Sequence, residues 1–530
     1  MSQQTDWLKF SNQLLRYSDP DLWLDTSLME LPDNLLELQE GLIKKSLEEM
    51  VAIEAGEKVN SDEDQDSGGR CVGHYWLRNP ELAPNEIGIT VQRKIAEIKA
   101  FSSGVHKGEI LNPSGEKFTD LLLIGIGGSA LGPQLAVDAL TDHTAPMNIH
   151  YFDNTDPDGM DRVLDKIESS ISRTLTIVIS KSGGTKETRN GMLEAKSAYE
   201  QAGLDFGKHA IAVTGEKSQL EECAIEENWI GIFPMEDWVG GRTSITSVVG
   251  LLPMALMGID VDKFLKGAAA MDAKTRPPEI NHNAALLMAL SWLHAGDAKG
   301  SKAMVILPYK DNLNLLSKYL QQLVMESLGK EFDRDGNQVH QGITVYGNKG
   351  STDQHAYVQQ LRDGINNFFV TFIEVRKSRA KDSIEVDPGF NTGDYLGGFL
   401  RGTRSALADA GRKSITISIP VVDAFYLGSL ISLFERSVSY YAALININAY
   451  HQPGVEAGKK AATQFLEILS KTEKFLTDHL GENSSVSQVA ESIKESEEVS
   501  FHALHHLAAN RKNISLDIGQ TPQDDKFVKN

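Results

Sequence analysis

Cysteine is scarce in this sequence, because only Cys71 and Cys223 occur among its 530 residues. Two cysteines so far apart cannot form the disulfide framework of a small secreted domain, and they suit a reducing compartment. The N-terminus also lacks the basic stretch and apolar run of a secretion signal. The most apolar segment, residues 248–259, is interrupted by glycine and proline, and it falls short of the roughly 20 residues that a membrane-spanning helix needs. We therefore expect a cytoplasmic protein without a membrane partner.

Positive charge is in the minority, with 52 Lys and Arg against 73 Asp and Glu and a formal net charge of −21. This balance argues against nucleic acid or an anionic membrane as the main partner. It does not exclude a small anionic substrate, which needs only a few local donors. Hydrophobic residues make up 41% of the chain, which is enough to form a core.

Short apolar runs alternate with helical stretches along much of the chain. Runs that are apolar throughout, rather than alternating, are typical of strands buried on both faces of a parallel sheet. Strands that alternate with helices predict an α/β layer fold. The expected strands cover residues 120–126, 174–180, 209–215, 303–308, 366–375 and 414–420.

This pattern suggests a division of the chain into four parts. Residues 1–100 look like a helical N-terminal region, which includes an acidic, glycine-containing loop at residues 61–70. Residues 101–285 and 286–480 would each form an α/β lobe, and residues 481–530 a helical C-terminal tail.

Two loops follow expected strands and open expected helices. Gly125 to Gly132 has the spacing G-x-G-G-S-x-x-G, which differs from the dinucleotide-binding G-x-G-x-x-G, and a tight turn for close packing is the alternative. Ser180 to Thr188 offers hydroxyl groups, one lysine and backbone N–H groups to a phosphate, and it lacks the ending of a Walker loop. Such a loop favours a phosphate that is held rather than transferred, although a capped helix would have a similar sequence.

Further along, several polar side chains occupy unusual positions. Arg242 follows paired glycines at the start of an apolar segment, where it could stabilise an oxyanion or belong to an internal ion pair. Gln322 and Glu326 would share one face of a helix over residues 313–328, among apolar neighbours. His355 would lie in the first turn of a helix capped by Ser351 or Thr352, where the helix dipole favours a neutral imidazole. Taken alone, each of these residues also has an ordinary structural interpretation: an internal ion pair for Arg242, a carboxylate at a helix end for Glu326, and a structural or exposed histidine for His355.

Six segments together resemble the glucose-6-phosphate isomerase (phosphoglucose isomerase) family. They are IGIGGSALGP, ISKSGGTKET, VGGRTS, QQLVMESLGK, GSTDQHAYVQQLRDG and QPGVEAGK, in this order between residues 123 and 459. The resemblance implies two sugar-isomerase (SIS) lobes, each a mainly parallel sheet between helices, in a homodimer with sites at the subunit interface. It implies interconversion of glucose 6-phosphate and fructose 6-phosphate in glycolysis and gluconeogenesis, without a metal ion or an organic cofactor.

The resemblance also assigns roles to individual residues. Glu326 would move a proton between C1 and C2, and Arg242 would stabilise the enediolate. His355, from the neighbouring subunit, and Lys459 would open the sugar ring. The remaining residues would bind substrate: Ser180, Lys181, Ser182 and Thr185 the phosphate, and Gly128, Ser129, Gln322 and Gln452 the sugar.

Two details depart from many relatives, namely the paired glycines of the SKSGGT loop and a proline at position 453. Three other interpretations stay open at this point. They are a nicotinamide-dependent oxidoreductase, against which the glycine spacing argues, a sugar-phosphate sensor without catalysis, and an isomerase that also acts on mannose 6-phosphate.

Overall fold

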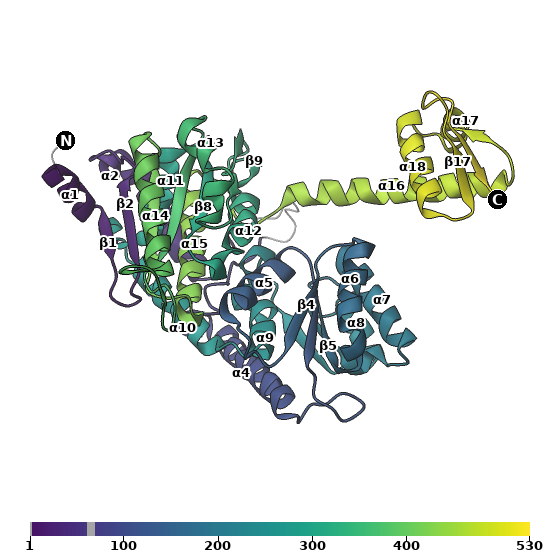
Figure 1. Cartoon of the computed structure of the whole chain (residues 1–530), viewed down its shortest axis with the longest axis horizontal. Helices are drawn as coiled ribbons and strands as arrows, with labels where there is room; N and C mark the ends of the chain where they lie inside the picture. The colour runs from purple at the N-terminus through teal and green to yellow at the C-terminus, as the bar shows by residue number, and fades with distance from the viewer. Residues whose placement is uncertain (1–2, 61–68) are drawn as a thin grey trace. The chain divides into compact units, whose positions relative to one another are not determined.

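The computed structural model describes residues 3–60 and 69–530, and the chain divides into two compact units, Met1–His451 and Gln452–Asn530 (Figure 1). Most of the expected acidic loop at residues 61–70 lies outside the described residues. The first unit contains two large, separate sheets with helices on their faces, and two small two-stranded sheets. The fold is therefore α/β with two SIS-type lobes, as predicted.

The first sheet is parallel throughout and has the strand order β4-β3-β5-β6-β7. Its central strands are buried on both faces, which explains their continuous apolar sequences. In β3, Leu121 and Leu123 pack into one hydrophobic cluster, whereas Leu122 and Ile124 pack into another on the opposite face. Helices cover both faces and give a three-layer arrangement. The strands are β3 (Asp120–Ile124), β4 (Asn148–Phe152), β5 (Thr174–Ser180), β6 (Ala210–Gly215) and β7 (Gly231–Met235), and the helices are α4 (Asn85–Lys107), α5 (Gly128–Leu140), α6 (Pro157–Ile167), α7 (Lys186–Gln201), α8 (Gln219–Glu226) and α9 (Val248–Leu256).

The second sheet has the order β1-β2-β15-β12-β8-β11. Strands β15, β12, β8 and β11 are parallel, and β2 pairs antiparallel with both β15 and β1. Strands β1 and β2 come from the first 30 residues, so the region expected to be helical also contributes two strands to the second sheet. The strands are β1 (Leu14–Arg16), β2 (Trp23–Leu28), β8 (Ala303–Pro308), β11 (Val345–Tyr346), β12 (Phe368–Val375) and β15 (Ser414–Ile419), with helices α3 (Glu40–Glu54), α10 (Val261–Thr275), α11 (Ala284–Ala295), α14 (Thr392–Asp409) and α15 (Ala424–Leu444) beside them.

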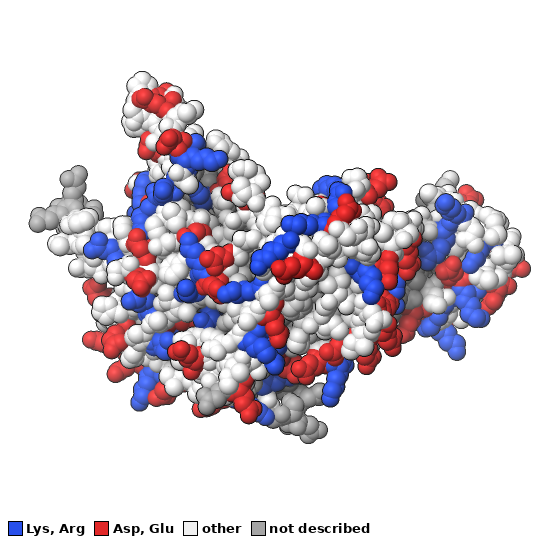
Figure 2. Space-filling view, turned by 90° about the horizontal axis from the view of Figure 1, so that it is seen from below, with Lys and Arg blue, Asp and Glu red and all other residues white. Residues whose placement is uncertain are grey.

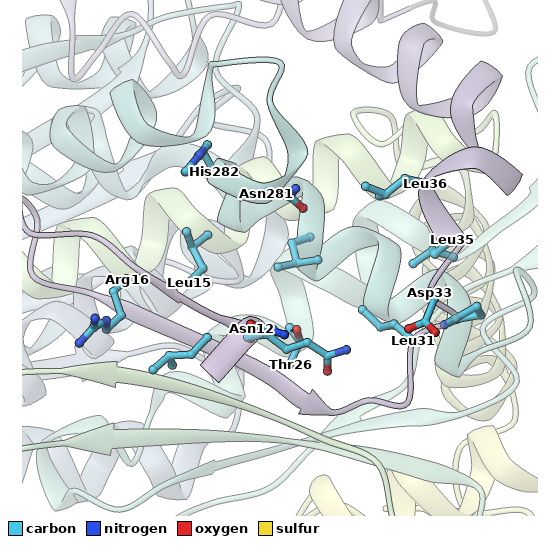
Figure 3. A pocket seen from close by; sticks show the side chains of 14 residues that line it. Asn12, Leu15, Arg16, Thr26, Leu31, Asp33, Leu35, Leu36, Asn281 and His282 are labelled. Atoms are coloured by element: carbon cyan, nitrogen blue, oxygen red, sulfur yellow. Dashed lines mark hydrogen bonds between the residues drawn. The ribbon is translucent and has the colours of Figure 1, made fainter. Parts of the chain in front are cut away.

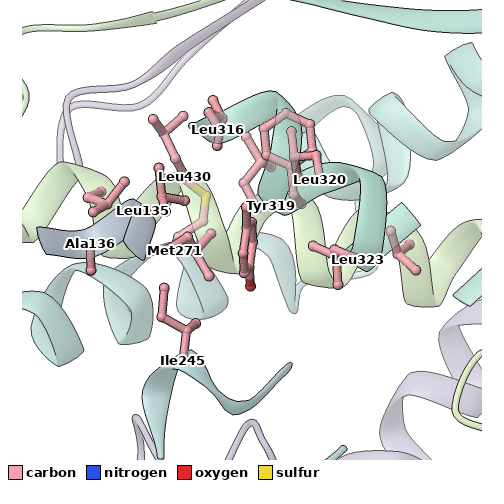
Figure 4. Packing of buried hydrophobic residues seen from close by; sticks show 14 of the residues in the cluster. Leu135, Ala136, Ile245, Met271, Leu316, Tyr319, Leu320, Leu323 and Leu430 are labelled. Carbon is pink, nitrogen blue, oxygen red and sulfur yellow. The ribbon is translucent and has the colours of Figure 1, made fainter. Parts of the chain in front are cut away.

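One hydrophobic core connects the two lobes. It extends from Leu121 in the first sheet to Ile306 in the second. Figure 4 shows where it passes between them, with side chains of α5, α10, α15 and the segment after β8 packed together. The labelled residues in this view are Leu135, Ala136, Ile245, Met271, Leu316, Tyr319, Leu320, Leu323 and Leu430.

The second unit has a small core of its own around Leu476, Val489 and Phe527. A long helix, α16 (Pro453–Asp478), precedes two shorter helices, α17 (Val486–Ile493) and α18 (Glu497–Asn510). A three-stranded antiparallel sheet joins them, with β18 (Lys526–Lys529) between β16 (Ser484–Ser485) and β17 (Ile514–Asp517). The helical tail expected at residues 481–530 thus contains α17 and α18 and also three short strands.

The charged side chains on the face shown in Figure 2 are mixed, with Lys and Arg scattered among Asp and Glu. Within the described residues, every helix is too short or too polar to span a lipid bilayer.

Candidate functional site

The two loops that the sequence singles out lie side by side at one edge of the first sheet. They follow β3 and β5, which are neighbouring parallel strands, so their carboxyl ends meet at the same edge. Gly127 has φ +57° and Gly183 has φ +71°, conformations that favour glycine. A Cβ atom at Gly183 would also strike the backbone nitrogen of Leu220. The backbone conformation therefore explains why glycine occupies both positions.

The second loop is organised by its own side chains. The hydroxyl of Ser180 accepts a hydrogen bond from the Gly183 N–H, and that of Ser182 accepts one from the Gly184 N–H, both at 3.2 Å. Thr185 is the N-cap residue of α7, but its side chain does not bond to the N–H groups of the first turn. These N–H groups point from a 16-residue helix toward the loop, and such groups attract anions.

Lys181 turns back toward the protein from the same loop. Its Nζ donates to the carbonyl oxygens of Asp237 at 2.9 Å and Val239 at 3.2 Å. Burial lowers the pKa of Lys181 below its usual value. The lysine therefore links the loop to the segment that leads to Arg242.

Arg242 is buried in the short helix η5 (Gly241–Thr246) and meets the end of the first unit. Its guanidinium donates to the carbonyl oxygens of Ala449 and His451 and, at 3.5 Å, to the hydroxyl of Ser327. Its Nη2 lies 3.2 Å from Oε1 of Glu326, and both side chains are largely buried. Burial lowers the pKa of Arg242, an effect that Glu326 opposes. The internal ion pair considered from the sequence is therefore present, and the partner of the arginine is the candidate base.

Glu326 ends a π-helical segment, η8 (Gln321–Glu326), which follows α12 (Leu316–Leu320). The expectation of one regular helix over residues 313–328 is therefore wrong in detail. Single turns of π-helix inside helices are frequent at functional sites. The side chain of Gln322, from the same segment, lies against Gly127, since a Cβ there would be 3.2 Å from Gln322 Nε2.

The glycine loop also touches the segment that carries Arg242. A Cβ atom on Gly128 would lie within 2.8 Å of Gly241 Cα and closer still to its carbonyl carbon and oxygen. The hydroxyl of Ser244 donates to the Gly128 carbonyl at 3.2 Å. Ser129 follows in the first turn of α5. The structure thus brings the glycine loop, Arg242, Gln322 and Glu326 together, although they are far apart in the sequence.

His355 is exposed at the end of a four-residue 3-10 helix, η9 (Thr352–His355). The expectation that it lies in the first turn of a longer helix is wrong, so the argument from the helix dipole does not apply. The loop itself is held by the buried carboxylate of Asp353, which accepts bonds from Asn348 N at 2.9 Å and Nδ2 at 3.1 Å, and from the Tyr357 hydroxyl at 2.5 Å. His355 is thus presented to solvent by a fixed loop.

Gln452 and Lys459 belong to the second compact unit. Gln452 is the N-cap residue of α16, and Pro453 starts this helix as predicted. The side chain of Lys459 lies outside the part of the chain that the structure describes.

One buried residue beside Glu326 was not singled out from the sequence. Lys330 donates from Nζ to the carbonyl oxygens of Glu326 at 2.7 Å and Ser327 at 2.8 Å. Burial and the neighbouring Arg242 lower the pKa of Lys330 to about 7. A lysine directly after the glycine that ends the predicted helix was the available signal, but lysines at helix ends are common.

A separate cavity of about 570 Å³ lies in the first unit, lined by residues of α1 (Gln3–Asn12), β1 and the loop before α11 (Figure 3). None of the candidate site residues lines it, and its labelled side chains mix leucines with Arg16, Asp33 and His282. Among the described residues, no three His, Cys, Asp or Glu side chains are grouped so that they could hold a metal ion.

The chain matches the phosphoglucose isomerase family over residues 27–389 and 405–487. A glucose-6-phosphate isomerase of Geobacter sp. (strain M21) is 54% identical over 531 residues, which cover 99% of each chain. One from Synechococcus elongatus is 53% identical over 521 residues, or 97% of each chain. Among solved structures, a glucose-6-phosphate isomerase from Chlamydia trachomatis has a TM-score of 0.79 at 25% identity and covers 89% of this chain and 92% of its own. The similarity extends over both lobes and includes the segments with Arg242, Glu326 and His355.

Proposed function

The chain belongs to the phosphoglucose isomerase family, and we propose that its site interconverts glucose 6-phosphate and fructose 6-phosphate with Glu326 as the base. The observation that carries the assignment of the base is the Arg242–Glu326 pair, whose nitrogen and oxygen are 3.2 Å apart. A carboxylate and a fixed positive charge, held beside a glycine loop and a phosphate-binding loop, are what an aldose–ketose isomerisation requires.

The phosphate would bind to Ser180, Lys181, Ser182 and Thr185. The exposed N–H groups at the start of α7 and the lysine support this role, since both favour a dianion. In an acidic protein, Lys181 and these N–H groups would supply the local positive potential that a phosphate needs. A phosphate held here contributes remote binding energy that orients the reacting carbons.

Proton transfer would then take place at Glu326. In the direction from aldose to ketose, the carboxylate takes the proton from C2, and the electrons of that bond form a C1–C2 double bond while O1 becomes an oxyanion. Arg242 stabilises this charge without giving up a proton. The protonated Glu326 returns the proton to C1, the O2 hydroxyl proton passes to O1, and O2 becomes the carbonyl oxygen. No electrons leave the substrate, so the reaction needs no redox cofactor, and in this proposal Arg242 supplies the positive charge that stabilises the oxyanion.

Ring opening would precede this step and would involve His355 and Lys459. The exposed position of His355 on a fixed loop supports a role toward a second copy of the chain, so we propose a homodimer with shared sites. Gly128, Ser129, Gln322 and Gln452 would contact the sugar. In this proposal residues 101–285 hold the phosphate, residues 286–480 supply the proton-transfer groups, and the enzyme serves glycolysis and gluconeogenesis in the cytoplasm.

The test is turnover of fructose 6-phosphate, coupled to a glucose-6-phosphate dehydrogenase, in the wild type, Glu326→Gln and Glu331→Gln. Glu331 is an exposed carboxylate five positions later and serves as the matched control. We expect Glu326→Gln to lower kcat by about 10²–10⁴-fold, and Glu331→Gln to retain the activity of the wild type. Equal activity in all three proteins would refute the role of Glu326. A folded wild type without turnover would refute the proposed reaction.

A further inference from the structure

Lys330 is an unusual residue because its charged end is buried beneath the end of the segment that carries Glu326. Its residue is only 5% exposed, and it begins strand β9 (Lys330–Phe332). The carbonyl oxygens of Glu326 and Ser327, to which its Nζ donates, lie where the helical hydrogen-bond ladder ends. Carbonyls in this position need partners from outside the helix.

The chain makes a tight turn to bring Lys330 back under Glu326. The Gly329 N–H donates to the Met325 carbonyl at 2.8 Å. A Cβ atom on Gly329 would lie 2.7 Å from that same oxygen, so the turn has no room for a side chain. The backbone conformation at Gly329 therefore determines the position of Lys330 relative to Glu326 and Ser327.

The charged groups that act on Lys330 come from two elements. Arg242, from η5, repels its positive charge, and Glu326, from the π-helical segment, attracts it. Arg242 also donates to the hydroxyl of Ser327, whose carbonyl accepts from Lys330. The charges of Lys330, Arg242 and Glu326 therefore influence one another, and Ser327 is hydrogen-bonded to both Lys330 and Arg242.

We propose that Lys330 is a positioning residue for proton transfer, which fixes the backbone of Glu326 through two hydrogen bonds and adds a positive charge behind the Arg242–Glu326 pair. This inference rests on the proposed function. It predicts an effect on kcat rather than on substrate capture, because the phosphate-binding loop belongs to the other lobe.

The two contributions of Lys330 can be separated by pH. A neutral amine still has two N–H groups, so both hydrogen bonds survive deprotonation while the charge is lost. Since burial and Arg242 lower the pKa of Lys330 to about 7, the charge of this lysine changes near neutral pH. The ratio of wild-type to Lys330→Met kcat should therefore change with pH around neutrality.

The experiment compares the wild type, Lys330→Met, Lys330→Arg and Lys413→Met in fructose 6-phosphate turnover from about pH 6 to about pH 9. Lys413 directly precedes β15 and therefore lies at the amino end of that strand. Its Nζ lies 2.8 Å from His294 Nε2. The Lys413→Met variant thus controls for the loss of a partly buried lysine. We expect Lys330→Met to lower kcat about tenfold or more, with KM nearly unchanged. Lys330→Arg should recover part of this loss, and its ratio to the wild type should also vary with pH because arginine stays charged.

A purely structural role would give a different pattern. In that case the ratio of wild-type to Lys330→Met kcat would be constant with pH, as we expect for Lys413→Met. Any loss of kcat would then parallel a loss of thermal stability. This pattern overturns the inference while the wild type remains active. If Lys330→Met does not fold, the pH dependence of the Lys330→Arg ratio decides, and a constant ratio again overturns the inference. An inactive wild type would remove both this inference and the proposed function.

Discussion

The glycine loop and the segment that carries Arg242 approach each other closely at Gly128 and Gly241. The variant Gly128→Ala should therefore disturb the position of Arg242. The added methyl group would lie 2.8 Å from Gly241 Cα and nearer still to its carbonyl group, whereas carbon atoms in contact normally stay about 3.5–4.0 Å apart. All three opposing atoms are backbone atoms, so no side-chain rotation can relieve the clash. The two segments must separate by about 1 Å or slightly more.

Such a displacement acts directly on the proposed catalytic pair of Arg242 and Glu326, because Arg242 follows Gly241 in the chain. Its Nη2 lies 3.2 Å from Glu326, and a shift of about 1 Å would break this contact. A misplacement of this size costs roughly 10²-fold in rate, which corresponds to about 2.7 kcal/mol of transition-state stabilisation. Overpacking should also lower the free energy of unfolding by about 1–3 kcal/mol.

The matched control is Gly241→Ala, on the other side of the same contact. A Cβ atom on Gly241 would meet nothing within 4 Å, so this variant should keep both its stability and its kcat. The assay is fructose 6-phosphate turnover, with circular dichroism to follow thermal unfolding. If Gly128→Ala were as active as Gly241→Ala, the close approach would not position Arg242, and the reasoning would be refuted.

Three further variants test other parts of the structure. Arg78→Met should lower the free energy of unfolding by about 3–5 kcal/mol, measured by denaturant titration, because it leaves the buried carboxylates of Asp272 and Glu435 without the guanidinium that bonds to both; a loss below about 1 kcal/mol would contradict this. Lys181→Met should raise KM for fructose 6-phosphate about tenfold or more and weaken inhibition by inorganic phosphate, with little change in kcat; a loss confined to kcat would exclude the proposed phosphate site. Because the pKa of Lys330 falls from 10.5 to about 7 on folding, the unfolded chain binds more protons between these values, and the stability of the wild type relative to Lys330→Met should rise with pH in this window. A flat or falling difference in denaturant titrations would contradict the burial of its charge.

The strands of both sheets could be predicted where burial on two faces leaves a run without charged residues that is rich in apolar and β-branched side chains. Thr174–Ser180 and Ser414–Ile419 are examples, and all residues of both strands are buried. Strand β1 has three residues and β11 has two, which is too short for any periodicity to stand out. Strand β2 pairs with β15, although almost the whole sequence of the first unit lies between the two strands. Such pairing depends on tertiary contacts rather than on local sequence.

The candidate site was predictable to the extent that its residues lie at the ends of strands and starts of helices. The loop at Ser180 and the position of Arg242 after two glycines belong to this class. The partners of Arg242 were not predictable, because one of them, the Ala449 carbonyl, is 207 positions away and a backbone oxygen leaves no mark in the sequence. The π-helical turn that ends at Glu326 was also missed. Its residue Gln322 contacts Gly127 from the other lobe, and such a tertiary contact is not visible in the local sequence.

The Arg242–Glu326 pair bears on how the proposed proton transfer would be driven. Before the reaction, the guanidinium of Arg242 faces the carboxylate of Glu326 at 3.2 Å. When the substrate develops an oxyanion, this new anion would compete with Glu326 for the same guanidinium. As Glu326 accepts the proton and loses its charge, the attraction of Arg242 would pass to the enediolate, and no group would have to move far. The interaction of Arg242 with the substrate would therefore be stronger in the transition state than in the ground state, which is the condition for it to raise kcat.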